Sequence, residues 1–236
     1  QNIKKGGLDT FVVNLINNWP YHQDDIILFC NHSHPGLINI KNNCKKNISI
    51  FKYRFMMQDD IRSIANNLPN IMKLLLKILI FPFLFPFHLL VVGDILKKAN
   101  LDRLLVINGG YPAGEVCLAA TISWGKINRE YKAWHNFHNL STPIEGSKFS
   151  FKRVYHNFID KLVGKYAEGF VSVSKACLLS IQNRNALINK KFAFIYNGLS
   201  IEKEKNIQSI RNQFGLKREA KILLMLAVYE SRKGHD

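Results

Sequence analysis

The chain has 236 residues, enough for one large domain or about one and a half ordinary ones, and 47% of them are hydrophobic, which is ample for a buried core. Lysines and arginines outnumber acidic residues by 33 to 17, giving a net charge of +16 that favours an anionic partner: nucleic acid, an acidic membrane surface or a phosphorylated substrate. The charge forms no long basic run, so a solvated surface in a lineage rich in Lys, Asn and Ile explains it equally well.

Four scattered cysteines without a CxxC pair weigh against a disulfide framework and a zinc site, and they favour reduced thiols in a cytosolic protein. The sequence opens without an initiator methionine or a signal peptide. Gln1 enters close to a glycine turn and Asp236 follows directly on a motif, so we expect the sequence to be a fragment.

Strand-like and helix-like segments alternate along the chain. An apolar stripe at helical spacing follows Gly6-Gly7 and stops before Pro20, which predicts a first helix. Short apolar runs predict strands at 25–30, 48–53, 101–107, 131–135, 169–173, 192–196 and from Ile222 onward. Further helices are predicted at 59–68, 115–124, 154–166, 175–183 and 200–214. This alternation predicts an α/β fold with a doubly wound, Rossmann-like parallel sheet.

The segment 71–92 is unusually apolar, but Lys73 and Lys77 interrupt its start, and Pro82 and Pro86 are expected to break its middle. These residues argue against a membrane-spanning helix, which needs about 20 largely apolar residues.

Two alternatives remain for segment 71–92. The first is a core helix with a proline-kinked exit. The second, which the net charge favours, is an interfacial element whose lysines meet anionic headgroups. Four phenylalanines would then dip into the acyl boundary: Phe81, Phe83, Phe85 and Phe87.

Two glycine turns come directly before predicted helices. Gly6-Gly7 could bring backbone N–H groups close to a phosphate, helped by the helix dipole, or form a simple turn. The segment Asn108-Gly109-Gly110-Tyr111 follows a buried strand, where a loop lining a ligand crevice would lie. A tight strand-to-helix turn explains it equally well.

A histidine is predicted at the carboxyl end of a strand. His135 could exchange a proton with a substrate there, or it could be a half-buried structural residue. Metal binding through His135 and His138, or through His32 and His34, lacks an acidic or cysteine partner at a useful spacing.

Three later segments carry weaker signals. Ser174 is a good helix N-cap, with substrate contact as a secondary possibility. Asn197-Gly198 predicts a turn with positive φ that could also bring main chain to a ligand. Lys233, after the last predicted strand, is suited to meet an anion such as phosphate.

Taken together, these segments resemble family 4 glycosyltransferases of the retaining GT-B type. The likeness spans Gly6 to Asp236 and rests on the order of six stretches: GGLDTFVVNL, INGGYPAGE, WHN, FIDKLVGKYAEGFVSVSKA, IYNGLSIEK and AVYESRKGHD. In that family an N-terminal domain binds the acceptor and a C-terminal domain binds the nucleotide sugar. The resemblance implies an acceptor domain at 1–215, whose first strand would precede it, and the start of the donor domain at 216–236.

The resemblance also implies site roles. Gly6, Gly7, Lys233 and Arg232 would bind the donor diphosphate, and His135 would lie near the transferred sugar. The cleft would be lined by Asn108, Gly109, Gly110, Tyr111, Asn136, Ser174, Asn197 and Gly198. No metal or other cofactor is implied. Two features depart from the family: Ala227-Val228 replaces a Gly-Arg pair, and the family's donor-binding glutamate pair is not in the sequence.

The implied function is transfer of a sugar, with retention, from a nucleotide sugar to a lipid-linked or polysaccharide acceptor in cell-envelope polysaccharide synthesis. We expect a cytoplasmic protein on the inner face of the cell membrane, held there by its basic charge and segment 71–92, and expect this chain to be inactive alone. The alternative is a non-catalytic basic module that binds membrane or nucleic acid, of which nucleic acid is the less favoured. A dinucleotide-binding enzyme is disfavoured because no GxGxxG follows a strand.

Overall fold

A computed structural model of the chain describes residues 6–54, 56, 60–61, 63, 66–112, 114–128, 130–143, 151–198 and 210–223. The chain divides into two compact units, Gln1–Gly198 and Leu199–Asp236. The described part of the second unit holds one short helix, α8 (Ile210–Gln213). Arg232, Lys233 and most of the last predicted strand lie outside the described residues, and the domain boundary at residue 215 stays a prediction.

The first unit alternates helices and strands along its length. Its elements are α1 (Gly7–Asn17), β1 (Ile27–Asn31), α2 (Leu37–Asn43), β2 (Ser49–Tyr53), α4 (Asn70–Lys98), β3 (Leu105–Asn108), α5 (Glu115–Ile127), β4 (Ala133–Phe137), α6 (Phe151–Tyr166), β5 (Ala167–Ser172), α7 (Lys175–Gln182), the 3-10 turn η1 (Asn185–Leu187) and β6 (Lys191–Phe194). Within the described residues, every paired strand runs parallel to its neighbour.

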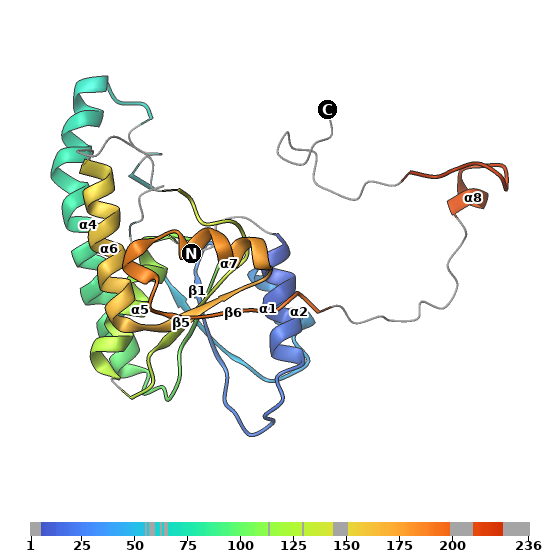
Figure 1. The fold of residues 1–236 in the computed structure, drawn as a ribbon, viewed down its shortest axis with the longest axis horizontal. Helices are drawn as coiled ribbons and strands as arrows, with labels where there is room; N and C mark the ends of the chain where they lie inside the picture. Colours follow the sequence, from blue (N-terminus) through green and yellow to red (C-terminus); the bar gives the residue numbers. More distant parts are fainter. Residues whose placement is uncertain are drawn as a thin grey trace. The chain divides into compact units, whose positions relative to one another are not determined.

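The strands form two parallel sheets with helices on both sides. One sheet pairs β1 with β2, and the other has the order β3-β4-β5-β6. Helices α1 and α2 lie on one side of the strands, and α4, α5 and α6 lie on the other (Figure 1). The predicted α/β class with parallel strands is therefore confirmed. Its finer assignment, one half of a GT-B enzyme, stays a prediction.

A cavity of about 750 Å³ lies between the two sheets. Its walls include β1 and β3. Within the described residues, β1 pairs with β2 and β3 pairs with β4. Apolar side chains of α1, α4 and α5 close the remaining sides, among them Val12, Leu96 and Val116. The first unit thus contains a large apolar hollow flanked by two strand edges.

The two sides of the strands have separate hydrophobic cores. The larger core packs α4, α5, α6 and α7 on the β3–β6 sheet, with Trp124, Phe137 and Phe170 among its fully buried side chains. The smaller core joins α1 and α2 through Val12, Ile16 and Ile40. The predicted apolar stripe of the first helix supplies this second core, because Val12 and Ile16 lie four residues apart on one helix face.

Helix α4 is the largest difference from expectation. It continues from Asn70 to Lys98 through Pro82 and Pro86, so the predicted break is wrong. Helical geometry separates the phenylalanines, since residues two apart point to opposite faces. Phe85 is 4% exposed and belongs to the core, whereas Phe83 is 70% exposed. Among the helices of the described residues, none combines the length and apolar character needed to cross a membrane.

Other boundaries differ more modestly. Helix α2 lies in the Asn- and Lys-rich connection for which no helix was predicted. Of the predicted helix 59–68, residues 59, 62, 64 and 65 lie outside the described part, and so does Ser200, the predicted start of the helix 200–214. Neither Asn197 nor Gly198 has a positive φ, so the predicted turn geometry there is wrong. The local Asn-Gly signal does not force a left-handed conformation when the chain leaves a strand extended.

Candidate functional site

The carboxyl ends of the parallel strands define the candidate site. β3, β4 and β5 end at Asn108, Phe137 and Ser172, and they pair in register up to those residues. The first turns of α1 belong to the same edge, because Phe11 meets the ring of His138 edge-on at 4.3 Å between centroids. Open parallel sheets hold their ligands at this edge.

A buried acid–histidine pair fixes the beginning of α1. Asp9 Oδ1 lies 2.9 Å from His34 Nε2, and Asp9 Oδ2 accepts a hydrogen bond of 3.1 Å from the backbone N–H of Gly6. Both side chains are buried. The only local signal for this pair is weak, an acid in the first helical turn, because the partner histidine is 25 residues away.

Gly36 makes room for that pair. A Cβ at Gly36 would collide with the Asp9 carboxylate and come within 2.6 Å of His34 Nε2. We expect Gly36→Ala to lower the free energy of unfolding by roughly 1–3 kcal/mol, because the pair must shift or lose its hydrogen bond. Urea unfolding of the purified chain measures this. Gly109→Ala is the matched control, since its Cβ would have no neighbour closer than 4.0 Å; equal losses in both variants would contradict the assignment.

The glycine turns themselves are open. A Cβ on Gly6 or Gly7 would meet nothing within 4 Å, and on Gly109 or Gly110 it would meet neighbours only at 3.8–4.0 Å. None of the four has a positive φ. Within the described residues, neither packing nor backbone strain therefore requires glycine here. Close approach of a bound group to the main chain would supply a reason.

Asn108 folds the loop that follows β3. Its Nδ2 donates to the Gly110 carbonyl at 3.0 Å, and its Oδ1 accepts from the Gly109 N–H at 2.7 Å. The side chain therefore shapes the loop through both ends of its amide. This bears out the tight-turn interpretation for Asn108 and leaves the backbone of the two glycines as the part of the loop that a ligand could approach.

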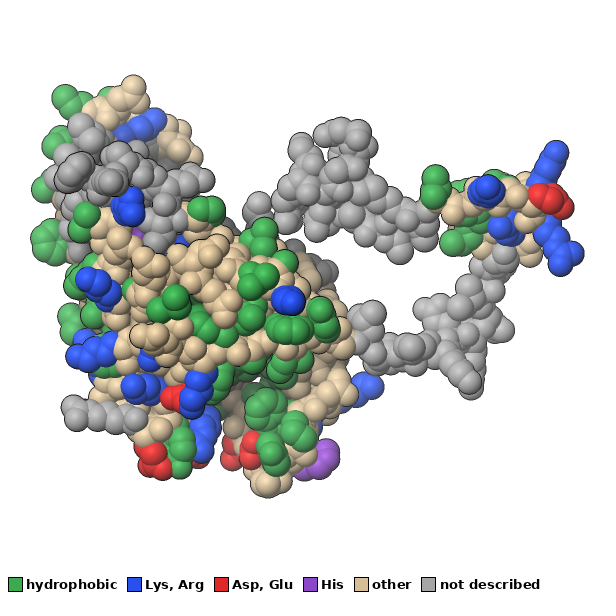
Figure 2. Space-filling model, in the orientation of Figure 1, with side chains coloured by type: hydrophobic (Ala, Val, Ile, Leu, Met, Phe, Trp, Pro, Cys, Tyr) green, Lys and Arg blue, Asp and Glu red, His purple; other side chains and the backbone are tan. Residues whose placement is uncertain are grey.

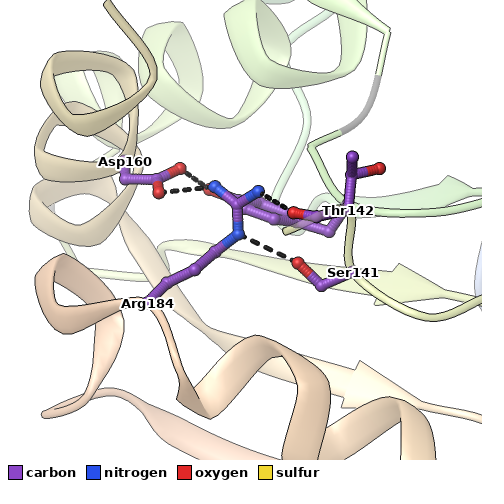
Figure 3. A network of polar contacts seen from close by, with 5 residues as sticks. Ser141, Thr142, Asp160 and Arg184 are labelled. Carbon is purple, nitrogen blue, oxygen red and sulfur yellow. Dashed lines mark hydrogen bonds and ion pairs between the residues drawn. The ribbon is translucent and has the colours of Figure 1, made fainter. Parts of the chain in front are cut away.

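Tyr111, at the end of that loop, is anchored in a buried polar network. Its hydroxyl donates to Asp160 Oδ1 at 2.8 Å, and Arg184 Nη1 donates to Asp160 Oδ2 at 2.6 Å. Figure 3 shows the guanidinium also reaching Ser141 Oγ (2.9 Å) and the Thr142 carbonyl (2.6 Å). Burial and the neighbouring Asp160 carboxylate raise the pKa of Tyr111 far above its ordinary value. Tyr111, predicted to line the cleft, is 1% exposed and ties two edge loops to α6.

His135 occupies the middle of β4, not its end. His135 pairs with Val106 of β3 and Phe170 of β5. Asn136 and Phe137 continue the same pairing, so β4 extends two residues beyond the predicted boundary. The imidazole is fully buried, stacked on Phe170, and burial lowers its pKa to about 4. Its Nδ1 lies 3.4 Å from Thr121 Oγ1, while its Nε2 has no hydrogen-bond partner among the described residues.

His138 is the histidine that reaches the surface of this edge. It is partly exposed, and its Nε2 lies 2.7 Å from Asn136 Oδ1. Asn136 is buried and donates to the Val171 carbonyl of β5 at 3.3 Å, so it holds His138 against the sheet. Burial lowers the pKa of His138. Sequence reasoning considered His138 only as a metal ligand.

The remaining predicted residues differ in exposure. Ser174 caps α7 as predicted, accepting a hydrogen bond from the Cys177 N–H at 3.2 Å. Asn197 and Gly198 are exposed at the end of the first unit. Among the described side chains, no group of three or more His, Cys, Asp or Glu residues is arranged to hold a metal ion.

Comparisons with protein-family models, with curated proteins and with solved structures found no match to this chain.

Proposed function

We propose that the chain forms the acceptor-binding part of a retaining glycosyltransferase of the GT-B type. One observation carries the proposal: the open glycine turns at Gly6-Gly7 and Gly109-Gly110 both belong to the carboxyl edge of a parallel α/β unit. The start of α1 offers backbone N–H groups and a positive helix end to a diphosphate. The loop after β3 would lie against the acceptor.

The cavity between the sheets supports the same proposal. In the fold that the resemblance implies, a strand leads into α1 and then into β1 by the right-handed crossover typical of parallel sheets. The cavity offers such a strand apolar walls and the edges of β1 and β3 on either side. Filling it would join the two sheets into the single doubly wound sheet predicted above.

Two histidines are proposed to serve the transferred sugar in different ways. The Nε2 of His135 has no partner among the described residues, so a sugar hydroxyl could supply one after the rings of Tyr111 or Phe170 move. His138 needs no such movement, because it is already partly exposed and oriented by Asn136. Lys233 and Arg232 would neutralise the leaving diphosphate. The proposal includes no metal or other cofactor.

The donor would be a nucleotide sugar and the acceptor lipid-linked or a polysaccharide, at the inner face of the cell membrane. To test this, the complete gene product is incubated with labelled nucleotide sugars and a lipid extract, and transfer is measured. Gly7→Ala is expected to reduce transfer about tenfold or more by blocking the diphosphate. Thermal unfolding should barely change, because the new Cβ meets nothing within 4 Å.

The alternative, a non-catalytic basic module, gives a different result. It predicts no binding of any nucleotide sugar by the complete gene product, together with salt-sensitive binding to random oligonucleotides. Unchanged transfer by a well-folded Gly7→Ala protein would remove the glycine turn from the mechanism while leaving the enzyme class intact.

A further inference from the structure

The outward face of α4 is apolar over most of its length. Its exposed apolar residues recur at helical spacing: Ile71, Met72, Leu75, Leu79, Phe83, Phe87 and Leu90. We call these seven residues the α4 row. At 1.5 Å per residue the row is about 28 Å long. Leu90 is 75% exposed, and contiguous exposed apolar surface of this kind marks an interaction site, whereas isolated apolar residues do not.

The α4 row cannot turn inward, because the opposite face of the helix is held. Phe85 and Val92 are buried in the core. His88 is fully buried, with Nε2 2.8 Å from the Met56 carbonyl and Nδ1 3.5 Å from Glu115 of α5. Ser123 of α5 donates to the Leu89 carbonyl at 2.9 Å. The exposure of the row is thus fixed by the packing of α4 on α5.

The charge near the α4 row indicates which kind of partner would bind there. Helices α4 and α6, which both pack on α5, carry eight lysines and arginines against two aspartates. Asp160 is buried against Arg184, and Asp94 pairs with Lys98. Figure 2 shows hydrophobic side chains along the outer edge of α4 with lysine and arginine side chains beside them. A second copy of the chain would bring the same positive charge to this face, which disfavours self-association.

We propose that the α4 row docks on an anionic lipid bilayer, with the helix lying along the membrane surface. The apolar side chains would enter the headgroup–acyl boundary while Lys97 and Lys161, both exposed, remain at the anionic headgroups. Nucleic acid offers no apolar phase for leucine and isoleucine. The proposal shares only its membrane location with the proposed function, and it concerns docking and not catalysis.

Vesicle flotation of the whole chain tests the proposal. We expect binding to phosphatidylcholine vesicles that contain phosphatidylglycerol, weaker binding to phosphatidylcholine alone, and weakening by salt. The double variant Leu79→Ser/Phe83→Ser should bind at least about tenfold more weakly. Leu179→Ser/Ile188→Ser is the matched control, since both residues are exposed apolar side chains away from α4, and it should bind like the wild type.

A gain of signal provides a second measurement. Phe83→Trp should acquire fluorescence that lipids with brominated acyl chains quench, and Leu179→Trp should not. Absence of vesicle binding, equal binding to neutral vesicles, or unchanged binding by the α4 double variant would each overturn the proposal. So would a chain that dimerises through the α4 row in the absence of lipid. Loss of nucleotide-sugar transfer with intact vesicle binding would instead count against the proposed function alone.

Discussion

Replacing Asp160 by alanine is expected to lower the free energy of unfolding by about 3–5 kcal/mol. The Arg184 guanidinium, 4% exposed, would then lie buried without its carboxylate, and Tyr111 would lose the acceptor of its hydroxyl. Urea unfolding followed by circular dichroism measures the change.

Two further variants make the Asp160 experiment specific. Asp94→Ala breaks an exposed pair with Lys98 at 2.7 Å and should cost only a few tenths of a kcal/mol. Asp160→Leu combined with Arg184→Met removes both charges, so its cost should be smaller than the sum of the single changes. If Asp160→Ala cost no more than Asp94→Ala, the network would not be the anchor of the edge loops.

Acidification is expected to destabilise the chain through His135. Burial lowers the pKa of its imidazole from the ordinary 6.5 to about 4 in the folded chain. Above pH 6.5 the histidine is neutral in both the folded and the unfolded chain, so its titration takes nothing from the free energy of unfolding. Between pH 6.5 and about 4 only the unfolded chain takes up the proton, and about 3 kcal/mol of stability is lost across that window.

The pH effect is isolated by comparing variants. His135→Leu lacks the titrating group, so its free energy of unfolding should fall less steeply between pH 7 and pH 4 than that of the wild type. Carboxylates titrate in the same range, but they are common to both proteins. His22→Gln serves as the control because His22 is exposed. Parallel profiles for wild type and His135→Leu would show that the buried imidazole is protonated without cost.

Local sequence patterns predict the helices and strands well, but they predict the surroundings of individual residues less well. The stripe of α1, the N-cap Ser174 and the parallel strands follow from residues that are close in sequence, and the structure confirms them. The predicted break in α4 is wrong because the proline rule is local. Packing of the helix on α5 holds it together through both prolines.

The site was harder to predict because its contacts are long-range. Asp160 and Arg184 are 24 residues apart, and Asp9 and His34 are 25 apart, so no sequence spacing indicates either pair. The apolar run stops at His135 and so predicts a strand end there, but the neighbours of β4 determine how far pairing continues. Which histidine is exposed is therefore a property of the sheet and not of the local sequence.

The cavity between β1 and β3 also affects how the chain responds to compression. The roughly 750 Å³ space is partly open to solvent, and the part that excludes water is eliminated on unfolding, which adds to the volume decrease. Hydrostatic pressure therefore acts against this chain more strongly than against a domain of similar size with a filled interior. An occupant that fills the space between the two strand edges would remove that sensitivity.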